Sequence, residues 1–357
     1  MPKRHYQVYA IVLAGGYATR LRPTSLSFTK HLVPLANRPV LGWVLSQIAE
    51  VGVREVFIVV GSHNREQIVE YVGDGSRFGV SVEYLVQERP LGLAHAVSLA
   101  EGFVDGPFLV YLGDNLLQGG VAQYAKRFLD AKADAMVLLK EVEDPTRFGV
   151  AVFDGGRLSG FVEKPRQPPS RYALVGVYFF TPAIFDYIKR LKPSWRGEYE
   201  ITDVLDLMLK DGRRVEYAVH DGWWLDVGKK DDVLAANALL LDEYARREVR
   251  GRVEDSKIEG RVVVEEGAVV RNSVVRGPAV VGRGAVIEGS FIGPYTSVGD
   301  GAVVRNSAVE YSVLMEGAVV EGVERLEESL VGRYARVASN ARRYVRLHIS
   351  DYSVVEL

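Results

Sequence analysis

The sequence predicts an α/β domain built on a mostly parallel sheet, followed by a parallel β-helix. Two observations carry this prediction. Up to about residue 240, apolar strand-like runs alternate with helix-like segments. Beyond residue 253, a short pattern of small and aliphatic residues returns about every 17 residues. Alternation of strands and helices is typical of α/β folds, whereas a short repeat indicates a solenoid.

The first half contains apolar runs that are each followed by a helix-like segment. The runs are 8–13, 54–60, 80–86 and 107–112, and helices are expected near 39–50, 64–72, 92–100 and 121–131. Continuously apolar strands between helices indicate a Rossmann-like sheet that is buried on both faces. In such sheets ligands bind beyond the carboxyl ends of the strands. Three polar features follow strands in this way: the glycine loop after 13, Gln87, and Gly113-Asp114.

The second half repeats with a fixed period. Gly-Ala-Val recurs at 267–269, 284–286, 301–303 and 317–319, and serines recur at 256, 273, 290 and 307. Aliphatic residues advance in steps of six, six and five, which excludes the 3.6-residue period of helices. We therefore expect three short strands per coil and roughly five coils between 253 and 338, interrupted at EGVERLEES (321–329). The end of the chain, LHISDYSVVEL, predicts a terminal strand.

Composition limits the classes of function. The chain has 357 residues, a quarter of them charged, with a net charge of −2, so no nucleic acid or membrane partner is expected. The absence of cysteine excludes disulfides and thiolate chemistry and fits a cytoplasmic protein. No signal peptide or membrane-spanning segment is expected. The predicted divisions are a domain at 1–240, a helical linker at 241–252, coils at 253–340 and a strand or tail at 341–357.

The glycine loop LAGGYATRL (13–21) raises the first functional question. It is neither a P-loop nor a GxGxxG fingerprint. One interpretation is a tight turn with a solvated arginine. The other is that Gly15 and Gly16 allow backbone N–H groups to approach a polyphosphate while Arg20 neutralises its charge.

Further motifs favour the second interpretation. After LAGGYATRLRP come TKHLVPLANRPV (29–40), LGDN (112–115), RFGVAVFD (147–154), FVEKP (161–165), LVGVYFF (174–180), RGEYEITD (196–203) and WWLDVGK (223–229). Their order over residues 8–245 resembles that of the sugar-1-phosphate nucleotidyltransferase family. The coils resemble hexapeptide repeats of the left-handed β-helix, which the long form of this family carries. Within the family, the chain is most similar to the group that transfers a thymidylyl group to glucose 1-phosphate.

The resemblance implies a role for each matching residue. Arg20 and Lys30 would be the catalytic cations at the reacting phosphates. Asp114 and Asp226 would hold Mg²⁺, and Gln87 and Gly92 would bind the base of dTTP or UTP. The pocket for the sugar 1-phosphate would contain Gly149, Glu163, Lys164 and Val175, with Arg196 as a further phosphate contact. We also expect a homo-oligomer.

Simpler interpretations stay open for single residues. Asp114 could be a turn-former or a helix cap, Lys164 a solvated charge, and Arg196 a surface arginine. His31 and His95 are expected to be satisfied or solvent-facing histidines without a catalytic role. Ala18 stands where the commoner family loop has a third glycine, and we expect the loop to form without a positive φ there.

Rival functions come from different classes. A non-catalytic regulatory subunit of the same architecture is disfavoured because the charged motif residues are all retained. An additional acyltransferase activity is disfavoured because the coils, as predicted, contain none of the six histidines. Uridylyl transfer is the main alternative to thymidylyl transfer, since one methyl group in an apolar contact contributes only about 1–3 kcal/mol. The coils are expected to be a scaffold for self-association.

Overall fold

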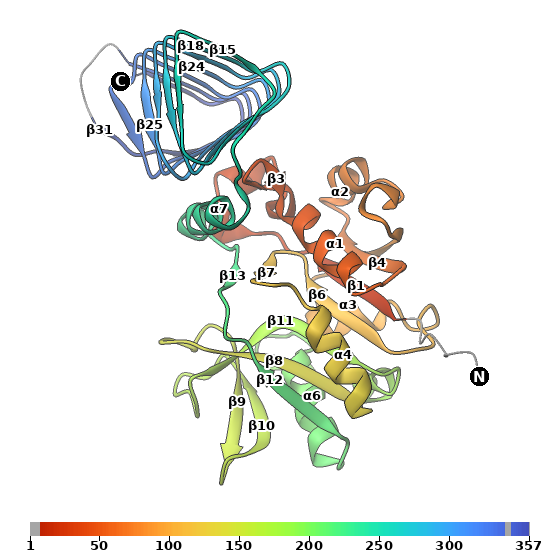
Figure 1. The fold of residues 1–357 in the computed structure, drawn as a ribbon. Coiled ribbons are helices and arrows are strands. Elements are labelled where there is room, and N and C mark those ends of the chain that lie inside the picture. Colours follow the sequence, from red (N-terminus) through yellow and green to blue (C-terminus); the bar gives the residue numbers. More distant parts are fainter. Residues whose placement is uncertain (1–7, 340–343, 357) are drawn as a thin grey trace. The chain divides into compact units, whose positions relative to one another are not determined.

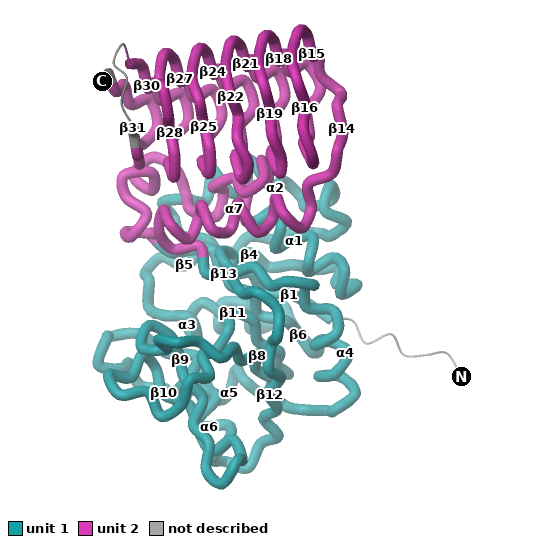
Figure 2. The backbone as a smooth tube through the Cα atoms, turned by 60° about the vertical axis from the view of Figure 1, so that its left-hand side comes forward, with its two compact units in different colours: residues 1–16, 41–226 teal, residues 17–40, 227–357 magenta. Residues whose placement is uncertain are grey.

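The computed structural model describes residues 8–339 and 344–356 (Figure 1). The chain forms two compact units (Figure 2). Unit 1 contains the residues up to Gly16 together with Leu41–Asp226, and unit 2 contains Tyr17–Val40 together with Val227–Leu357. The segment 17–40, which the sequence places inside the first domain, thus belongs to the same compact unit as the coils.

Unit 1 is built on one mixed sheet in the strand order β10-β9-β11-β6-β1-β4-β5, with β8 beside β11 and β12 beside β8. Pairs β1–β4, β1–β6, β4–β5 and β8–β12 are parallel. Pairs β9–β10, β9–β11, β6–β11 and β8–β11 are antiparallel. The α/β prediction is confirmed, and its parallel part carries the predicted strands 8–13, 54–60, 80–86 and 107–112. The strands are β1 (Tyr9–Ala14), β4 (Glu55–Gly61), β5 (Ser81–Gln87), β6 (Phe108–Leu112), β8 (Ala135–Glu141), β9 (Gly149–Asp154), β10 (Arg157–Glu163), β11 (Tyr172–Phe180) and β12 (Val215–Val219). A separate two-stranded sheet pairs β7 (Asn115–Leu117) with β13 (Trp224–Asp226).

Helices cover both faces of the large sheet. The helices of unit 1 are α1 (Val40–Glu50, whose first residue lies in unit 2), α2 (Arg65–Val72), α3 (Leu93–Ser98), α4 (Ala122–Ala131), α5 (Ile184–Ile188) and α6 (Ile201–Lys210), with a 3-10 turn η4 at Ser76–Phe78. Helices α3, α5 and α6 share one core with Ile11, Val110 and Phe180. On the other face, Tyr111 donates a hydrogen bond to Gln47 of α1, and Phe128 of α4 contacts Phe179. None of the helices in the described part of the chain is long and apolar enough to span a bilayer.

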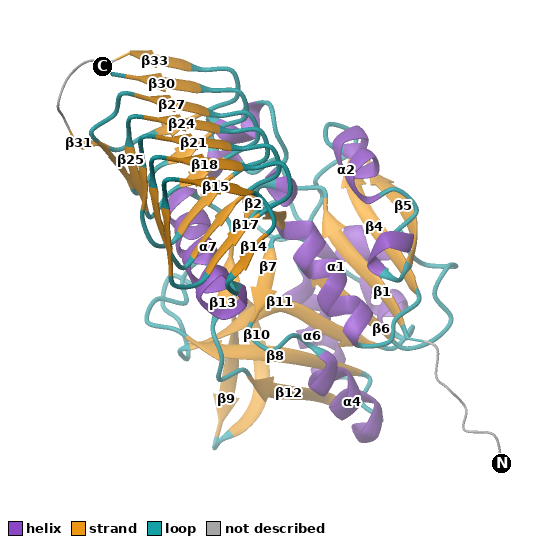
Figure 3. Cartoon of the chain, turned by 45° about the horizontal axis from the view of Figure 1, so that its top comes forward, coloured by secondary structure: helices purple, strands orange, loops and turns teal. Residues whose placement is uncertain are grey.

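The coils of unit 2 form three parallel sheets (Figure 3). The first sheet contains β14 (Glu248–Val249), β17 (Val262–Val264), β20 (Ala279–Val281), β23 (Thr296–Val298), β26 (Val313–Leu314), β29 (Leu330–Val331) and β32 (His348–Ile349). The second contains β15 (Arg252–Glu254), β18 (Val269–Arg271), β21 (Val286–Glu288), β24 (Val303–Arg305), β27 (Val319–Glu321), β30 (Arg336–Ala338) and β33 (Val354–Glu356). The third contains β16 (Lys257–Glu259), β19 (Val274–Arg276), β22 (Phe291–Ile292), β25 (Ala308–Glu310), β28 (Arg325–Glu327) and β31 (Tyr344–Val345). The coils thus extend beyond the predicted limits, from Glu248 to Glu356, and the predicted terminal strand is part of the last coil.

Buried aliphatic residues and serine ladders hold the coils together. The aliphatic residues that advance in steps of six, six and five, from Val264 to Val309, line one hydrophobic core. The N–H of Ser273 donates to Ser256 Oγ at 3.0 Å, and the same bond recurs from Ser290 to Ser273 and from Ser307 to Ser290. Each hydroxyl thereby satisfies a buried amide that lies in a corner between strands.

The predicted interruption at 321–329 is wrong. Within it, β28 pairs with β25, and directly after it β29 pairs with β26. Val323 is fully buried where earlier coils have serine, and its N–H still donates to Ser307 Oγ at 3.0 Å. A second ladder begins at Ser312 and passes through Ser329 to the N–H of Leu347. The coil therefore continues although its side-chain pattern changes.

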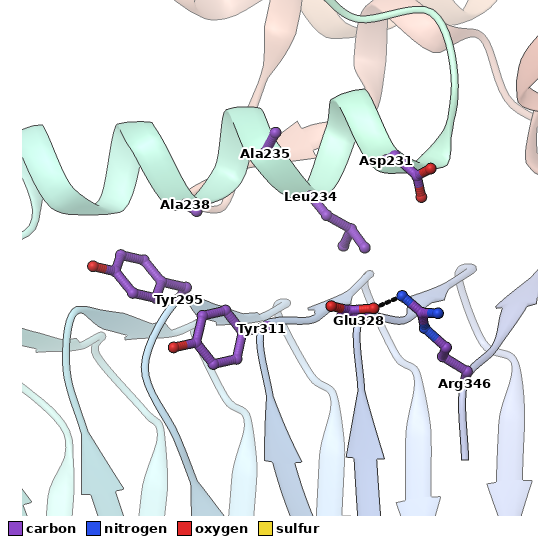
Figure 4. A pocket seen from close by; sticks show the side chains of 8 residues that line it. All are labelled: Asp231, Leu234, Ala235, Ala238, Tyr295, Tyr311, Glu328 and Arg346. Atoms are coloured by element: carbon purple, nitrogen blue, oxygen red, sulfur yellow. Dashed lines mark ion pairs between the residues drawn. The ribbon is translucent and has the colours of Figure 1, made fainter. Parts of the chain in front are cut away.

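Helix α7 (Lys230–Tyr244) lies along one corner of the coils (Figure 4). The predicted boundary at residue 240 falls inside this helix, and the predicted linker contains its end together with β14. Tyr295 and Tyr311 stand on the corner with ring centroids 5.3 Å apart. A pocket of about 290 Å³ lies between helix and corner, lined by Asp231, Leu234, Ala235, Ala238, Tyr295, Tyr311, Glu328 and Arg346. None of the predicted site residues lines it.

The segment 17–40 contains three 3-10 turns and a short hairpin. These are η1 (Thr19–Leu21), η2 (Thr24–Leu26), η3 (Lys30–Leu32), β2 (Pro34–Leu35) and β3 (Arg38–Pro39). Arg20 lies in η1 and Lys30 begins η3.

Candidate active site

Gly15, predicted to approach the triphosphate, and Gln87, predicted to bind the base, lie at the carboxyl edge of the parallel strands. Gly15 follows β1, and Gln87 is the last residue of β5. A Cβ on Gly15 would lie 3.3 Å from the N of Gly61 and 3.5 Å from Oε1 of Gln87. Strand register thus brings the glycine loop, the end of β4 and Gln87 to one place, as the rule for ligand sites in α/β sheets predicts.

Gln87 and Gly92 form one cluster with His95 and Tyr199. The Gln87 Nε2 donates to the Gly92 carbonyl at 3.2 Å and lies 2.9 Å from His95 Nδ1. The N–H of Tyr199 donates to the Leu91 carbonyl at 2.8 Å, and the Tyr199 ring stacks on His95. His95 is therefore a satisfied histidine, as expected, and it orients the Gln87 amide.

Gly92 is required by both backbone angle and space. Its φ is +102°, and an added Cβ would lie 2.6 Å from the Tyr199 carbonyl oxygen. Gly92→Ala should therefore destabilise the protein by about 3 kcal/mol, the sum of backbone strain and a steric collision. Thermal unfolding of purified protein measures this effect.

Gly102→Ala is the matched control. Gly102 has a φ of +91°, and nothing lies within 4 Å of an added Cβ. The free energy of unfolding of Gly102→Ala should fall by only about 1 kcal/mol, because of backbone strain. Equal losses in the two variants would show that the contact between Gly92 and Tyr199 does not constrain the loop.

Four residues predicted for the sugar pocket gather in a second cluster. Glu163 Oε1 lies 3.7 Å from Lys164 Nζ and 3.8 Å from Arg196 Nη1. A Cβ on Gly149 would lie 3.2 Å from Glu163 Oε2, so this glycine leaves space beside the carboxylate. Lys164 and Arg196 are therefore members of a charged cluster, which disfavours the isolated-surface interpretation of both.

Two further residues complete this cluster. The Thr202 hydroxyl donates to Glu163 Oε2 at 3.1 Å, and the buried Glu200 accepts from Arg196 Nη1 at 3.1 Å. Burial raises the pKa of Glu163, and the charge of Glu200 adds to this effect, while Lys164, Thr202 and Arg196 oppose it. The cluster thus combines a desolvated carboxylate that can accept from hydroxyl groups with two cations suited to a phosphate.

Val175 is different from the other predicted pocket residues. It lies in β11 and is fully buried. Its neighbour Gly176 leaves the space that the Asn115 side chain occupies, because a Cβ there would lie 2.7 Å from Asn115 Oδ1. Val175 is thus a core residue of β11, and its place in the sugar pocket stays a prediction.

The two predicted metal ligands lie close together along the backbone, because Asp226 ends β13 and Asp114 immediately precedes β7, the strand that pairs with β13. Asp226 is paired with Asn115 in the β7–β13 ladder, and Asp114 directly precedes Asn115. The Asn115 amide donates to Asp114 Oδ1 at 2.9 Å, and Trp224 Nε1 donates to Asn115 Oδ1 at 2.7 Å. This chain of hydrogen bonds orients the Asp114 carboxylate, so a simple turn-forming role does not account for the arrangement.

The donor set fits Mg²⁺ rather than a metal held wholly by protein. Among the described residues, no group of three or more His, Cys, Asp or Glu side chains could enclose a metal ion. Mg²⁺ is usually held by one or two carboxylates, with water and substrate phosphates completing the shell. Asp114 and Asp226 match that pattern.

Arg20 and Lys30 lie in unit 2, on the segment 17–40. Arg20 is exposed, and its Nη2 lies 3.2 Å from the position of a Cβ on Gly228. Asp232 accepts hydrogen bonds from the N–H groups of Gly228 and Lys229 at the start of α7. His31, next to Lys30, is buried and 3.0 Å from the Thr29 hydroxyl, so it is satisfied as expected.

The expectation for Ala18 is wrong. Ala18 has a φ of 51° and a ψ of 43°, in the left-handed region. Its carbonyl accepts from the N–H of Leu21 at 3.0 Å and from the Ser25 hydroxyl at 2.7 Å, and these bonds hold it there. Alanine takes the conformation that glycine adopts more easily, at a cost on the order of 1 kcal/mol.

Sequence reasoning missed several residues of the site. His63 lies beside the glycine loop and hydrogen-bonds to the Gly16 backbone, and burial lowers its pKa. Asn64 donates to the Ala14 carbonyl at 2.8 Å and thereby ties the end of β4 to that of β1. Both follow a predicted strand, which is a signal that could have found them. Tyr199, Glu200 and Trp224 lie inside quoted motifs, but their contacts depend on tertiary structure.

Comparisons with known proteins find relatives for both halves of the chain. Residues 9–243 match the family described as nucleotidyl transferase, and residues 243–335 match the one described as GlmU-like C-terminal hexapeptide. The chain is 45% identical to a glucose-1-phosphate thymidylyltransferase of Streptomyces griseus, over 98% of this chain and 99% of the relative. It is 38% identical to a UTP–glucose-1-phosphate uridylyltransferase of Haloferax volcanii, over 66% of this chain and 97% of the relative.

A solved structure from Bacillus anthracis, described as a candidate glucose-1-phosphate thymidylyltransferase in complex with sucrose, has the fold of the first domain. The two structures superpose with a TM-score of 0.62 at 38% sequence identity. The aligned region covers 65% of this chain and 94% of the Bacillus anthracis chain. The hexapeptide match agrees with the predicted β-helix, so the predicted fold class is confirmed in both halves.

Proposed function

The chain belongs to the nucleotidyl transferase family, and we propose that it transfers a thymidylyl group from dTTP to glucose 1-phosphate. The products are dTDP-glucose and pyrophosphate. Relatives that cover nearly the whole chain and are named for this reaction support the proposal. The roles of individual residues come from the resemblance of their motifs to the family, and the geometry of the two clusters supports those of Gln87, Gly92, Glu163, Lys164 and Arg196.

One segment carries the argument from geometry, because residues 194–202, which lead into the first turn of α6, contact both clusters. On one side, the Tyr199 backbone and ring contact Leu91 and His95 beside the base-binding Gln87. On the other side, Arg196 and Thr202 contact Glu163 in the sugar cluster. This single short segment therefore couples the binding of a base to the binding of a sugar phosphate, which is what a two-substrate transferase requires.

The reaction needs charge neutralisation more than proton transfer. A phosphate monoester has its second pKa near 6, so the attacking oxygen of the sugar 1-phosphate is already ionised at neutral pH. It attacks the α-phosphorus in line, the bond to the bridging oxygen breaks, and pyrophosphate leaves with the electron pair. Catalysis is then mostly positioning and electrostatic stabilisation. A site with lysines, arginines and two aspartates, but no paired nucleophile and base, suits this chemistry.

Each residue has a specific task in this proposal. Gln87 and Gly92 bind the base, while the backbone at Gly15 and Gly16 approaches the triphosphate. Lys164 and Arg196 hold the phosphate of the sugar, and Glu163 accepts from a sugar hydroxyl. Arg20 and Lys30 neutralise charge on the α-phosphate and on the leaving pyrophosphate.

Asp114 and Asp226 would hold Mg²⁺. A Mg²⁺ held there would supply positive charge that offsets the negative charge of the two substrates. Asn115 and Trp224 orient the carboxylate of Asp114 through their hydrogen bonds. Such supporting hydrogen bonds are a general feature of metal sites.

Glu163→Gln tests the sugar cluster. The variant should raise the KM for the sugar phosphate by about tenfold, because one hydrogen bond to an ionised acceptor contributes about 1.5–3 kcal/mol. The KM for the nucleotide should stay within about twofold. Glu141→Gln, an exposed glutamate on β8, is the control and should change neither KM.

The same variant should not lose stability at neutral pH. Since the pKa of Glu163 is higher in the folded protein than in the unfolded chain, its ionised form lowers the free energy of unfolding. That cost is present at pH 7 and disappears below the pKa of the unfolded chain. The melting temperature of Glu163→Gln should therefore equal or exceed that of the wild type at pH 7, and the difference should vanish near pH 4. A large loss of stability at pH 7 would contradict the assigned electrostatics.

Pyrophosphate release tests the function directly. The full-length protein is assayed with Mg²⁺, the five nucleotides dTTP, UTP, CTP, ATP and GTP, and several sugar 1-phosphates. We expect dTTP with glucose 1-phosphate to give the highest kcat/KM. A higher value with UTP would favour uridylyl transfer, the second candidate, which the Haloferax volcanii relative supports. Absence of release with every pair would favour a regulatory subunit.

The setting of the protein follows from these substrates. Nucleoside triphosphates and sugar phosphates are cytoplasmic metabolites, so we place the reaction in the cytoplasm. We further propose a homo-oligomer, with the coils as its scaffold. Contrary to the expectation that no histidine lies in the coils, His348 belongs to β32 of the last coil. Its Nε2 lies 3.0 Å from the Thr24 hydroxyl, so His348 is part of a structural contact and does not favour an acyltransferase activity.

A further inference from the structure

The segment that carries Arg20 and Lys30 is attached to the last coil of the β-helix. Buried Thr24 lies with its hydroxyl 3.0 Å from His348 Nε2. The Ser27 hydroxyl donates to Asp351 Oδ2 at 3.1 Å. Both contacts join residues more than 320 positions apart in the sequence, within one compact unit.

Asp351 is the centre of this attachment. Its side chain is fully buried, and the guanidinium of Arg333 donates to its Oδ2 from Nη2 at 2.6 Å and from Nε at 3.1 Å. The N–H of Arg333 also donates to Oδ1 at 2.8 Å. The same guanidinium lies 4.0 Å from the centroid of the Phe28 ring. A buried carboxylate with this many donors has one orientation, so it is a rigid anchor for Ser27 and Phe28.

A second attachment lies further along the segment. Asn37 Nδ2 donates to the Val298 carbonyl at 2.7 Å, and the N–H of Ala36 donates to Asn237 of α7 at 2.8 Å. Asn237 is itself fixed by the Ser297 hydroxyl at 2.6 Å. Lys30 thus lies between two points at which the segment is bound to the coils and to α7.

We propose that the last coil positions the catalytic cations, with Asp351 and Arg333 as positioning residues for nucleotidyl transfer. This inference rests on the proposed function, in which Arg20 and Lys30 act on the phosphates. It extends the role of the β-helix beyond a scaffold for self-association. The coils hold the segment 17–40 in the conformation that the reaction uses.

Electrostatic stabilisation of a transition state explains why such an anchor matters. A charge is effective only if it is already in place, because reorganisation during the reaction removes most of its benefit. A misplacement of about 1 Å can lower a rate about 100-fold. Arg20 is exposed, and Lys30 follows Phe28 by two residues, so the position of both depends on how the surrounding segment is held.

The test compares Asp351→Asn with Asp300→Asn in the full-length protein. Asp300 Oδ1 accepts from the N–H of Arg283 at 2.8 Å, as Asp351 Oδ1 does from Arg333, and the contacts described for Asp300 lie within the coils. Asp351→Asn should lower kcat about tenfold while changing the KM of either substrate less than threefold. Asp300→Asn should leave kcat unchanged. Rates are measured well below the melting temperature of each variant.

Two further measurements separate positioning from stability. Ser27→Ala removes one exposed hydroxyl and keeps the Arg333–Asp351 pair, so it provides a folded variant even if Asp351→Asn does not fold; it should lower kcat severalfold. The double variant Asp351→Asn/Arg20→Ala should lower kcat by less than the product of the two single-variant factors. The reason is that a displaced Arg20 already contributes less to the rate.

The outcomes are distinct. Unchanged kcat in both Asp351→Asn and Ser27→Ala would overturn the proposal, and so would full additivity of Asp351→Asn with both Arg20→Ala and Lys30→Ala. If the wild-type protein transfers no nucleotidyl group to any sugar phosphate, the proposed function has failed instead.

Discussion

Arg20→Ala is expected to leave the fold intact and to lower kcat roughly 10²–10³-fold. This is the usual loss when one preorganised charge-stabilising donor is removed from a site. Arg20 is exposed on η1, and its guanidinium lies close to the backbone of Gly228 at the start of α7. Little packing therefore depends on it, and the expected effect is on the reaction. Pyrophosphate release gives the rate, and circular dichroism with thermal melts checks the fold.

Arg22→Ala is the matched control for this prediction. Arg22 is also exposed, lies two residues further along the same segment and carries the same charge. Its removal changes the net charge equally and should change kcat by less than about threefold, since it has no assigned task at the phosphates. Equal losses in the two variants would show a general effect of charge. Activity of Arg20→Ala within a few-fold of the wild type would remove Arg20 from the site.

The repeat architecture was predictable because each coil contacts mainly its neighbours. Val264, Val270 and Val275 recur with a period that the sequence shows directly. The continuation through Val323 was not predictable in the same way. There, the serine pattern fails while the hydrogen bond from the Val323 N–H to Ser307 is kept. A hydrogen bond from a backbone N–H does not depend on the side chain at that position, so the sequence does not show it.

The candidate site was predictable where motifs carry the functional side chain itself. Glu163 and Lys164 are both in FVEKP, and the structure brings Arg196 to them from a distant motif. The contacts of Tyr199 and the left-handed conformation of Ala18 were not predictable, because both depend on backbone geometry set by tertiary packing. For the same reason, no local pattern assigns the segment 17–40 to the unit that contains the coils.

The metal site gives the second large expected effect. Asp226→Asn removes one negative charge from the pair of carboxylates that would hold Mg²⁺, and it keeps the size and shape of the side chain. Asp226 and Asn115 are partners in the β7–β13 ladder, so the backbone should stay in place. We expect kcat to fall at least tenfold at fixed Mg²⁺, because an amide replaces a charged ligand of a hard cation. The Mg²⁺ concentration for half-maximal rate should rise by a similar factor.

Asp154→Asn is the control for the change in charge, because Asp154 is an exposed residue at the end of β9. Its Mg²⁺ titration should match that of the wild type. A second readout does not depend on turnover and uses dTTP without a sugar phosphate. Under these conditions, added Mg²⁺ should raise the melting temperatures of the wild type and of Asp154→Asn more than it raises that of Asp226→Asn. Because Asp114 keeps its hydrogen bond from Asn115 in the variant, residual binding should persist at high Mg²⁺ and the lost rate should be partly recovered there. Superimposable Mg²⁺ titrations of Asp226→Asn and the wild type would show that this carboxylate is not a ligand, and the two-carboxylate site would then have to be abandoned.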